Sequence, residues 1–348
     1  MRADRVKIAI YGAGAMGTVL GAFLTEAGIN CDLISRNLAH VEAMKRKGAT
    51  VICKADGERK TVAVHAFLPE EMTGQYDLIF LMTKQRENQK LAEFLKDKLT
   101  ADGIVCTTQN GLLEESLREI LGKERVYGAA VSFGANMLGE GSVELTSKLS
   151  SMSMQVGGYQ NANEKLPLLK DVLSGISAVC GNAEFLKTTE NLAGARWSKL
   201  CINAAFSGLS VCTGCNFGRL AKRIKSKKVA LAIIRECLAV AQALQVKVEP
   251  MQGHDLQKLL GDGGFFQNVK AKFVLPIAMK KHALLTSGML KDVQNGRKCE
   301  IDFINGKVVE LGKRAGIPTP FNEQVVEIVH GIENGLYEIS YKNLDFFI

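Results

Sequence analysis

Residues 6–35 have the sequence VKIAIYGAGAMGTVLGAFLTEAGINCDLIS, and this stretch decides the fold. It begins with a short apolar run, residues 6–11, that predicts a buried strand. A glycine-rich turn, a segment of helical spacing at 18–27 and a second apolar run at 30–35 follow within about 30 residues. A strand, a G-x-G-x-x-G turn, a helix and another strand in this order are typical of a dinucleotide-binding unit.

The three glycines of this turn have different expected tasks. Gly12 permits the tight turn, Gly14 lets the backbone approach a pyrophosphate, and Gly17 lets the helix pack on the strand. The helix start then offers free N–H groups and a positive dipole end to phosphate groups. A glycine-rich turn without a ligand is the alternative interpretation. The predicted cofactor-binding residues of the turn are Gly12, Ala13, Gly14, Ala15, Met16 and Gly17.

The residues after the second strand indicate which dinucleotide binds. An NAD-binding unit usually places Asp or Glu there, to accept from the 2′-hydroxyl of the ribose. This chain has Ser35, Arg36 and Asn37 instead. A guanidinium can bind a 2′-phosphate through paired hydrogen bonds, whereas a carboxylate would repel the phosphate. We therefore predict NADPH as the cofactor with Arg36 on its 2′-phosphate; a solvent-exposed loop arginine is the alternative.

Further apolar runs alternate with helical spacing through the first half of the chain, which predicts a mostly parallel sheet. In such sheets a ligand binds beyond the carboxyl ends of the strands. Lys84 follows one predicted strand and Asn110 another, so we expect both near the cofactor, although each is also compatible with an ordinary loop residue. The predicted strands are 78–83, 104–107, 126–131 and 152–156, and helices are predicted at 87–99 and 114–121.

From about residue 190 onward the pattern changes to helical spacing. The sequence therefore predicts an α/β fold in which an N-terminal Rossmann-like dinucleotide-binding domain, residues 1–188, precedes a C-terminal all-α domain, residues 189–348. In the second domain we predict helices at 230–244, 307–314 and 322–332, with Pro318 and Pro320 in a loop, and a loop or lid edge at 253–266.

Three residues of the second half carry groups suited to acid–base chemistry. Lys199 and Asn203 are four positions apart in a helical segment, so they share one face. A lysine in so apolar a segment is unusual unless it is paired or functional. Glu300 is the third candidate. The alternative for Lys199 is a lysine whose stem is buried while its ammonium is hydrated, and the alternative for Glu300 is an ordinary surface glutamate.

Composition limits the class of protein. The 348 residues are 47% hydrophobic and 23% charged, which is ordinary for a globular enzyme. No apolar run is long enough to span a bilayer and no signal-peptide order begins the chain, so we expect a cytoplasmic protein without a membrane partner. The nine cysteines indicate reduced thiols. Cys212 and Cys215 have C-x-x-C spacing, but no second pair follows, so we predict packed side chains in a helix and no metal.

The net charge of +8 suits anionic ligands such as a dinucleotide and a carboxylate. Nucleic acid is the competing interpretation, and the densest basic run is the place to look for it. That run has no interleaved aromatic residues and matches no nucleic-acid motif, so we predict a solvated helix face and no nucleic-acid partner. Its members are Lys222, Arg223, Lys225, Lys227 and Lys228.

Taken together, these motifs resemble the 2-dehydropantoate 2-reductase (ketopantoate reductase) family over nearly the whole chain. The resemblance implies an NADPH-dependent oxidoreductase of pantothenate and coenzyme A biosynthesis, with a Rossmann domain joined to a helical domain. It is carried by GAGAMG at 12–17, Ser35-Arg36, Lys84, Gln109-Asn110-Gly111, Trp-x-Lys-x-x-x-Asn at 197–203, Met289-Leu290-Lys291-Asp292, and Glu300-Ile301-Asp302-Phe303-Ile304-Asn305-Gly306.

The resemblance also implies roles for single residues. Lys199 is implied as the general acid and Glu300 as the residue that holds the hydroxyl or carbonyl end of the substrate, and these two form the predicted catalytic pair. The chemistry agrees, because hydride delivery to a ketone builds negative charge on its oxygen, which an ammonium stabilises and protonates. Lys84 and Asn110 are implied at the nicotinamide end of the cleft. The predicted substrate-binding residues are Asn110, Asn203, Ser207 and Ser287.

Two departures from the family pattern concern the substrate shell. The family usually has Asn-Pro after the helix asparagine, where this chain has Ser207-Gly208, and it often has Asn-Thr-Ser-Ser where this chain has Leu285-Thr286-Ser287-Gly288. A pocket that loses hydrogen-bond partners discriminates less sharply for a hydroxylated substrate. We predict reduction of 2-dehydropantoate to pantoate, with a more apolar 2-oxo acid as the alternative substrate.

Alternatives of another class are a non-catalytic NADP(H)-binding sensor and a two-domain dehydrogenase of phosphorylated sugars or sugar nucleotides. Retention of Lys199, Asn203 and Glu300 argues against the sensor. The only partner that the sequence predicts is a small 2-oxo acid, and it leaves a homodimer open.

Overall fold

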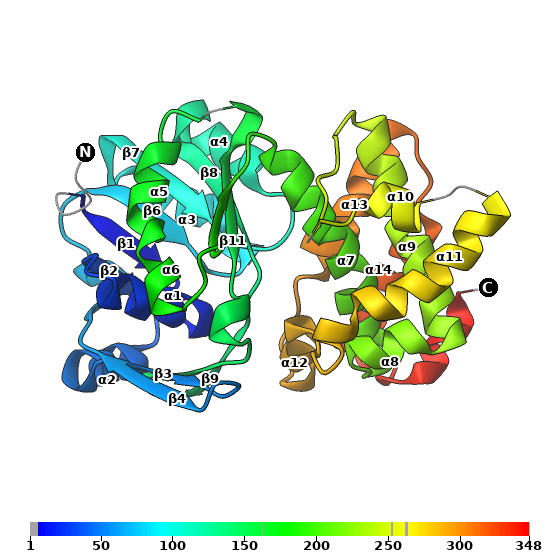
Figure 1. The fold of residues 1–348 in the computed structure, drawn as a ribbon, viewed down its shortest axis with the longest axis horizontal. Helices are drawn as coiled ribbons and strands as arrows, with labels where there is room; N and C mark the ends of the chain where they lie inside the picture. The colour runs from blue at the N-terminus through cyan, green and yellow to red at the C-terminus, as the bar shows by residue number, and fades with distance from the viewer. Residues whose placement is uncertain (1–5, 162, 252, 262–263, 348) are drawn as a thin grey trace. The chain divides into compact units, whose positions relative to one another are not determined.

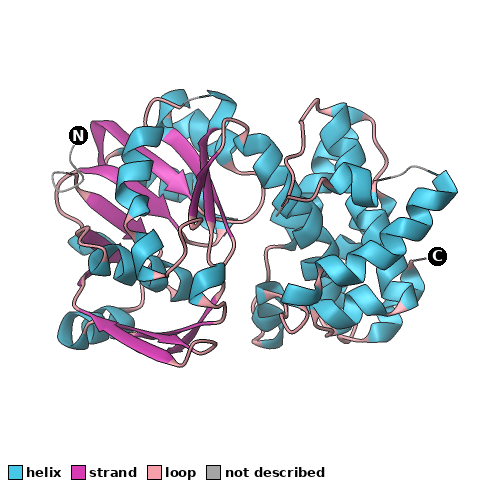
Figure 2. Cartoon of the chain, in the orientation of Figure 1, coloured by secondary structure: helices cyan, strands magenta, loops and turns pink. Residues whose placement is uncertain are grey.

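The computed structural model describes residues 6–161, 163–251, 253–261 and 264–347. The chain forms two compact units, which are described separately (Figure 1). The N-terminal unit contains Met1–Gln109 and Leu113–Leu192, and the helical unit contains Ala193–Ile348 together with Asn110–Leu112. The turn after Gln109 therefore belongs to the helical unit, although the strand before it does not. Strands and helices mix in the first unit, whereas the second is built of helices (Figure 2).

An eight-stranded sheet is the centre of the N-terminal unit. Its order is β12-β11-β8-β7-β6-β1-β2-β5, and every neighbouring pair is parallel except β8 and β11. This confirms the predicted, mostly parallel sheet. From β1, the strands β2 and β5 follow on one side of the sheet, and β6, β7 and β8 follow on the other. The strand order therefore reverses between β1 and β6, which is where such sheets bind ligands. The strands are β1 (Ile8–Tyr11), β2 (Cys31–Ile34), β5 (His65–Phe67), β6 (Tyr76–Leu81), β7 (Leu99–Thr107), β8 (Val126–Val131), β11 (Met154–Gly158) and β12 (Leu186–Thr188).

Successive side chains of the central strand β1 enter two different cores. Ile8 and Ile10 of β1 belong to a core with α1 and α5, while Ala9 and Tyr11 belong to one with α3 and α4. A parallel sheet covered on both faces explains why its strands read as continuous apolar runs. The helices of this unit are α1 (Ala15–Glu26), α2 (Leu38–Lys47), α3 (Asn88–Lys96), α4 (Glu114–Leu121), α5 (Leu166–Ser174) and α6 (Ile176–Val179), with short 3₁₀ helices η2 (Pro69–Glu71), η3 (Gln85–Glu87), η4 (Lys123–Arg125), η5 (Leu149–Ser151) and η6 (Tyr159–Asn161).

A second sheet of four strands was not expected from the sequence. Its order is β4-β3-β10-β9, and β9 and β10 are an antiparallel pair. The buried members Val51 and Val143 join the same core as α1. The second sheet consists of two short antiparallel pairs, β3 with β4 and β9 with β10, that lie far apart in sequence, so no single window of residues shows the sheet. They are β3 (Ala49–Cys53), β4 (Glu58–Val62), β9 (Ala135–Gly139) and β10 (Ser142–Leu145).

In the helical unit, α9 packs against α8, α10, α11, α13 and α14, and residues of α7 from Trp197 to Cys212 contribute to the same core. This confirms the predicted pairing of a Rossmann-like unit with an all-α unit. The helices are α7 (Leu192–Thr213), α8 (Phe217–Lys222), α9 (Ile224–Ala243), α10 (Leu256–Leu260), α11 (Gly264–Ala278), α12 (Gly288–Gln294), α13 (Ile301–Ala315) and α14 (Pro320–Glu333), with η7 (Lys280–His282) and η8 (Tyr341–Phe346).

Three local predictions in this unit were wrong. The expected loop at 253–266 contains α10 and the start of α11, because the Asp255 side chain accepts from the Lys258 N–H and so caps α10; residues 262–263 of that loop lie outside the described residues. Cys215 does not lie in a helix with Cys212, since α7 ends at Thr213. Pro320 is not a loop residue either, because it occupies the first turn of α14, where a missing N–H costs nothing.

Candidate active site

The glycine turn lies where the strand order reverses, and two of its glycines have no room for a side chain. A Cβ on Gly12 would lie 2.6 Å from the Thr83 N beyond β6, and Gly12 has a φ of +105°. A Cβ on Gly17 would lie 2.4 Å from the Gly12 carbonyl oxygen. Gly12 therefore fixes the turn against β6, and Gly17 lets α1 start directly behind it.

Gly14 differs from the other two glycines because nothing lies within 4 Å of the Cβ that it lacks. It is exposed, and Ala15 and Met16 beside it are half-buried. The first turn of α1 carries no acidic side chain, and no side chain caps it. The first N–H groups of a helix have no partner within the helix. This open backbone with a positive dipole end fits a dinucleotide pyrophosphate.

Beyond β2, Arg36 forms an ion pair with Glu87 of η3, with 2.7 Å between Nη1 and Oε2. The side chains are 71% and 52% exposed, so the pair is worth little and can be exchanged for another anion. The sequence indicated Arg36 but not Glu87, because 51 residues separate them. The 2′-phosphate role of Arg36 stays a prediction.

The ends of β6 and β7 are joined by the side chain of Gln109. Its Nε2 donates to the Thr83 carbonyl at 2.7 Å and to the Asn88 Oδ1 at 2.8 Å, and its Oε1 accepts from Thr107 and from Asn88 at 3.1 Å each. Gln109 is buried. The exposed Lys84 follows Thr83 and the exposed Asn110 follows Gln109, so this network fixes the backbone before each of these predicted site residues.

In the helical unit, α7 presents one polar stripe. Lys199, Asn203 and Ser207 are four residues apart, and all three are half-buried, whereas most of their helix neighbours are fully buried. Residues at this spacing lie on the same helix face. The structure therefore brings together three of the predicted site residues.

Lys199 has an unusual pKa. Burial, with the neighbouring positive charge of Arg196, lowers it from 10.5 to about 7. Among the residues that the structure describes, no carboxylate pairs with the Lys199 ammonium. A lysine that titrates near neutrality can donate a proton far more readily than a hydrated one.

A buried polar network holds α7 in place beside the stripe. The Asn305 Nδ2 of α13 donates to the Ala204 carbonyl at 3.1 Å and to the Asn322 Oδ1 at 2.9 Å. Asn322 donates in turn to the Glu236 carboxylate of α9, from its side chain at 2.7 Å. A Cβ on Gly208 would lie 2.8 Å from the Asn305 Oδ1 and 2.6 Å from Val325. Gly208 thus permits this close packing, and sequence reasoning missed the network.

Glu300 directly precedes α13 and is half-buried. The residue before it, Cys299, donates its backbone N–H to the Glu333 carboxylate at the end of α14, at 2.6 Å. The start of α13 is therefore anchored one residue away from Glu300.

Ser287 occupies a different kind of position from the stripe. It is buried, and its Oγ accepts from the Met289 N–H at 3.1 Å as the N-cap of α12. Its backbone N–H donates to the Ser210 Oγ of α7 at 3.4 Å, so the segment before α12 lies against α7. Gly288 is exposed, with nothing within 4 Å of the Cβ that it lacks, and Leu285 is 39% exposed. The outward residues of this segment are therefore Leu285, Thr286 and Gly288.

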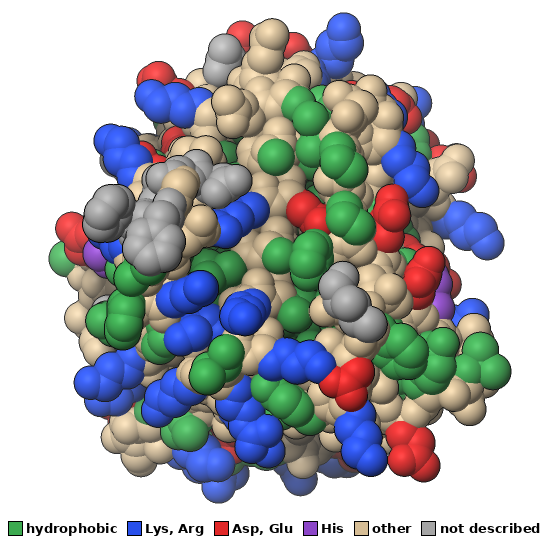
Figure 3. Space-filling view, turned by 90° about the vertical axis from the view of Figure 1, so that its right-hand side faces the viewer, with side chains coloured by type: hydrophobic (Ala, Val, Ile, Leu, Met, Phe, Trp, Pro, Cys, Tyr) green, Lys and Arg blue, Asp and Glu red, His purple; other side chains and the backbone are tan. Residues whose placement is uncertain are grey.

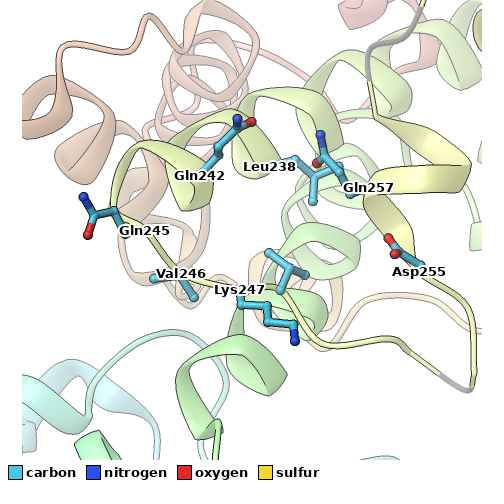
Figure 4. A pocket seen from close by; sticks show the side chains of 8 residues that line it. Leu238, Gln242, Gln245, Val246, Lys247, Asp255 and Gln257 are labelled. Carbon is cyan, nitrogen blue, oxygen red and sulfur yellow. The ribbon is translucent and has the colours of Figure 1, made fainter.

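A separate groove of about 450 Å³ lies in the helical unit (Figure 4). None of the predicted site residues is among those that line it. They are Leu238, Gln242, Gln245, Val246, Lys247, Val248, Asp255 and Gln257.

Remaining surface predictions have the following positions. The basic run spans the end of α8 and the start of α9; four of its five side chains are exposed, and Lys225 is paired with Asp345. Figure 3 shows Lys and Arg side chains interspersed with hydrophobic ones on the face of the molecule that it draws. In the described part of the chain, no three side chains of metal-ligand type cluster, and no helix is long and apolar enough to cross a membrane.

A Rossmann-type unit with an open glycine turn, together with a helical unit that carries a lysine of lowered pKa, defines the class of two-domain dinucleotide-dependent oxidoreductases. The ketopantoate reductase PanE/ApbA family model matches residues 8–159, and the model of its C-terminal domain matches residues 191–333. The chain belongs to the ketopantoate reductase family. The enzyme class, and NADPH as the reductant of the family, are thereby confirmed.

Relatives and solved structures cover nearly the full length. The 2-dehydropantoate 2-reductases of Lactococcus lactis and Archaeoglobus fulgidus are 26% and 27% identical, over 94% and 97% of this chain and 98% and 100% of their own. The ketopantoate reductase of Ralstonia eutropha has 27% identity and a TM-score of 0.76, over 95% of this chain and 99% of its own. A D-mandelate dehydrogenase with NADH and anilino(oxo)acetate has 25% identity and a TM-score of 0.79, with the same coverage.

Proposed function

We propose that this enzyme reduces the ketone of a small 2-oxo acid with NADPH, and that 2-dehydropantoate is the first candidate substrate. The observation that carries the proposal is Lys199, a lysine of lowered pKa on a polar stripe, in a chain of this family. The full-length 2-dehydropantoate 2-reductase relatives support the first candidate.

The proposed cofactor site is the open backbone of the glycine turn. NADPH supplies the hydride when it is bound. The N–H groups of Ala15 and Met16 at the start of α1 bind the pyrophosphate beside the open Gly14, and Arg36 exchanges Glu87 for the 2′-phosphate. Lys84 and Asn110 serve the nicotinamide end. The Gln109 network keeps the backbone before both residues fixed, so little ordering is needed on binding.

The proposed acid is the Lys199 ammonium. As the carbonyl carbon gains a hydride, the carbonyl oxygen gains negative charge and takes a proton from Nζ, which leaves a neutral amine. A pKa of about 7 makes this amine easy to form and easy to reprotonate from water. Glu300 and Asn203 hold the substrate, and Ser207 extends the stripe. Ser287 caps α12, and its contact with the substrate stays a prediction.

A more apolar 2-oxo acid is the second candidate. The stripe ends in the short Ser207, and the segment before α12 turns Leu285 and the side-chain-free Gly288 outward. A substrate hydroxyl would find fewer partners there, and an apolar substituent would find more room. The solved D-mandelate dehydrogenase complex with anilino(oxo)acetate shows that a structurally similar protein accepts an aromatic ligand.

The test is NADPH oxidation with 2-dehydropantoate against branched and aromatic 2-oxo acids, measured as kcat/KM. The first candidate predicts the highest value for 2-dehydropantoate. A higher value for an aromatic or branched acid would replace it by the second. Gly288→Ser and Leu285→Asn should then shift the ratio toward 2-dehydropantoate. NADPH binding without turnover of any 2-oxo acid would indicate a sensor instead. The cytoplasmic location and the homodimer stay predictions.

A further inference from the structure

A buried histidine, His40, connects three elements directly behind the glycine turn. It lies in the first turn of α2, where the Asn37 side chain caps the helix and accepts from the His40 N–H. Its Nδ1 accepts from the Gly141 N–H, in the turn between β9 and β10, at 2.9 Å. Its Nε2 lies 3.0 Å from the Thr18 Oγ1 of α1. His40 is 1% exposed, and it belongs to none of the sequence motifs described above.

The direction of these hydrogen bonds can be worked out from the backbone. The Gly141 N–H can only donate, so the Nδ1 must carry the lone pair and the neutral ring carries its proton on Nε2. Nε2 then donates to Thr18, and the Thr18 hydroxyl donates to the Ala13 carbonyl at 3.4 Å. One directed chain therefore runs from Gly141 to Ala13, the second residue of the glycine turn.

The other side of the Ala13 residue is also fixed. Its N–H donates to the Ile34 carbonyl at the end of β2, at 2.8 Å. The next residue, Gly14, is the open position where the backbone meets the pyrophosphate in the proposed function. The peptide that follows Ala13 is also held at both ends, because its carbonyl accepts from the Thr18 hydroxyl and its N–H, that of Gly14, donates to the Gly12 carbonyl at 2.7 Å. The Thr18 contact therefore helps to orient the Ala13–Gly14 peptide.

We propose that His40 and Thr18 are positioning residues for the NADPH-binding turn, and that protonation of His40 releases the turn and weakens NADPH binding. A charged imidazole has N–H groups at both nitrogens, so its Nδ1 would face the Gly141 N–H donor to donor. The inference rests on the proposed NADPH site and adds a pH response to it.

Burial supports the neutral state, because it lowers the pKa of His40 below its usual 6.5, against a smaller opposite effect of the Ala13 carbonyl. No charged side chain of the described residues contributes to this shift. Charged groups on the surrounding elements have other partners or face solvent. These groups are Glu26 of α1, paired with Lys60; Lys45 of α2, paired with Glu42 and with Glu71; the exposed Arg46 and Lys47 of α2; Glu144 of β10, paired with Lys54; and the exposed Glu140.

The first test measures the Kd of NADPH by nicotinamide fluorescence at pH 7.5. Thr18→Val keeps the shape and loses the hydroxyl, so the Kd should rise about fivefold, the equivalent of one hydrogen bond, with kcat at saturation unchanged. Thr18→Ser keeps the hydroxyl and should stay within about twofold of wild type. Equal Kd values for wild type and Thr18→Val, or for Thr18→Val and Thr18→Ser, would overturn the proposal.

The second test follows the Kd from pH 8 to pH 5. The 2′-phosphate itself titrates in this range, so the diagnostic is the difference between proteins. Wild type should lose affinity more steeply with acid than His40→Asn, which keeps an acceptor for Gly141 but cannot be charged. His254→Asn, a change at an exposed histidine of the helical unit, should follow wild type. Parallel curves for wild type and His40→Asn would overturn the pH response. A wild type that binds no NADPH at any pH would overturn the proposed function as well.

Discussion

Replacing Lys199 by methionine should stabilise the protein while it removes the acid. Burial lowers the pKa of Lys199 from 10.5 in the unfolded chain to about 7. The unfolded chain therefore binds this proton more tightly than the folded chain does. At pH 7 this difference lowers the free energy of unfolding by roughly 4 kcal/mol, and the loss decreases as the pH rises toward 10.5. Lys199 is only half-buried, so about 2–4 kcal/mol is the expected gain for Lys199→Met at pH 7.

The assay is urea unfolding of wild type and Lys199→Met between pH 7 and pH 9.5. Wild-type stability should rise relative to the variant as the pH increases, because the proton that the unfolded chain binds more tightly contributes less to its free energy at higher pH. Lys199→Arg is the matched control, since its charge persists and it should be the least stable of the three at high pH. Lower stability of Lys199→Met at pH 7, or a constant difference across the range, would refute the assigned burial of the ammonium.

Other changes test the N-terminal unit. Arg36→Asp should raise the KM for NADPH far more than the KM for NADH, and equal increases for both cofactors would show that Arg36 does not bind the 2′-phosphate. Glu87→Gln removes the partner of Arg36 and should lower the KM for NADPH. Gly17→Ala places a methyl group 2.4 Å from the Gly12 carbonyl, so fluorescence titration should show NADPH affinity reduced at least tenfold, by about 1.4 kcal/mol or more. Gln109→Leu leaves the buried hydrogen-bond partners of Gln109 unpaired, so urea unfolding should show a free energy of unfolding lowered by about 2–3 kcal/mol. A change below about 0.5 kcal/mol would contradict the network.

The glycine turn was predictable because its chemistry is local. Gly12, Gly14 and Gly17 lie within six residues, and the strand before and the helix after them follow from short periodic patterns. The stripe of Lys199 and Asn203 was predictable for the same reason, since four-residue spacing fixes a helix face.

What the sequence concealed depends on contacts between distant residues. Glu87 reaches Arg36, and Gly141 reaches His40, only after the sheet has formed. Ser287 shows the opposite limit. Its position in a motif indicated substrate, and that contact stays a prediction; the structure adds that its hydroxyl caps α12, because the spacing of residues does not determine which partner a hydroxyl finds.

The most direct test of the catalytic account is a single turnover of Lys199→Ala loaded with NADPH, with Lys225→Ala as the surface-lysine control. NADPH should bind with nearly wild-type affinity, and its oxidation by the best 2-oxo acid should slow by about 10²–10⁴-fold, while Lys225→Ala keeps the wild-type rate. A Lys199→Ala rate above about one tenth of wild type would show that the proton comes from another group.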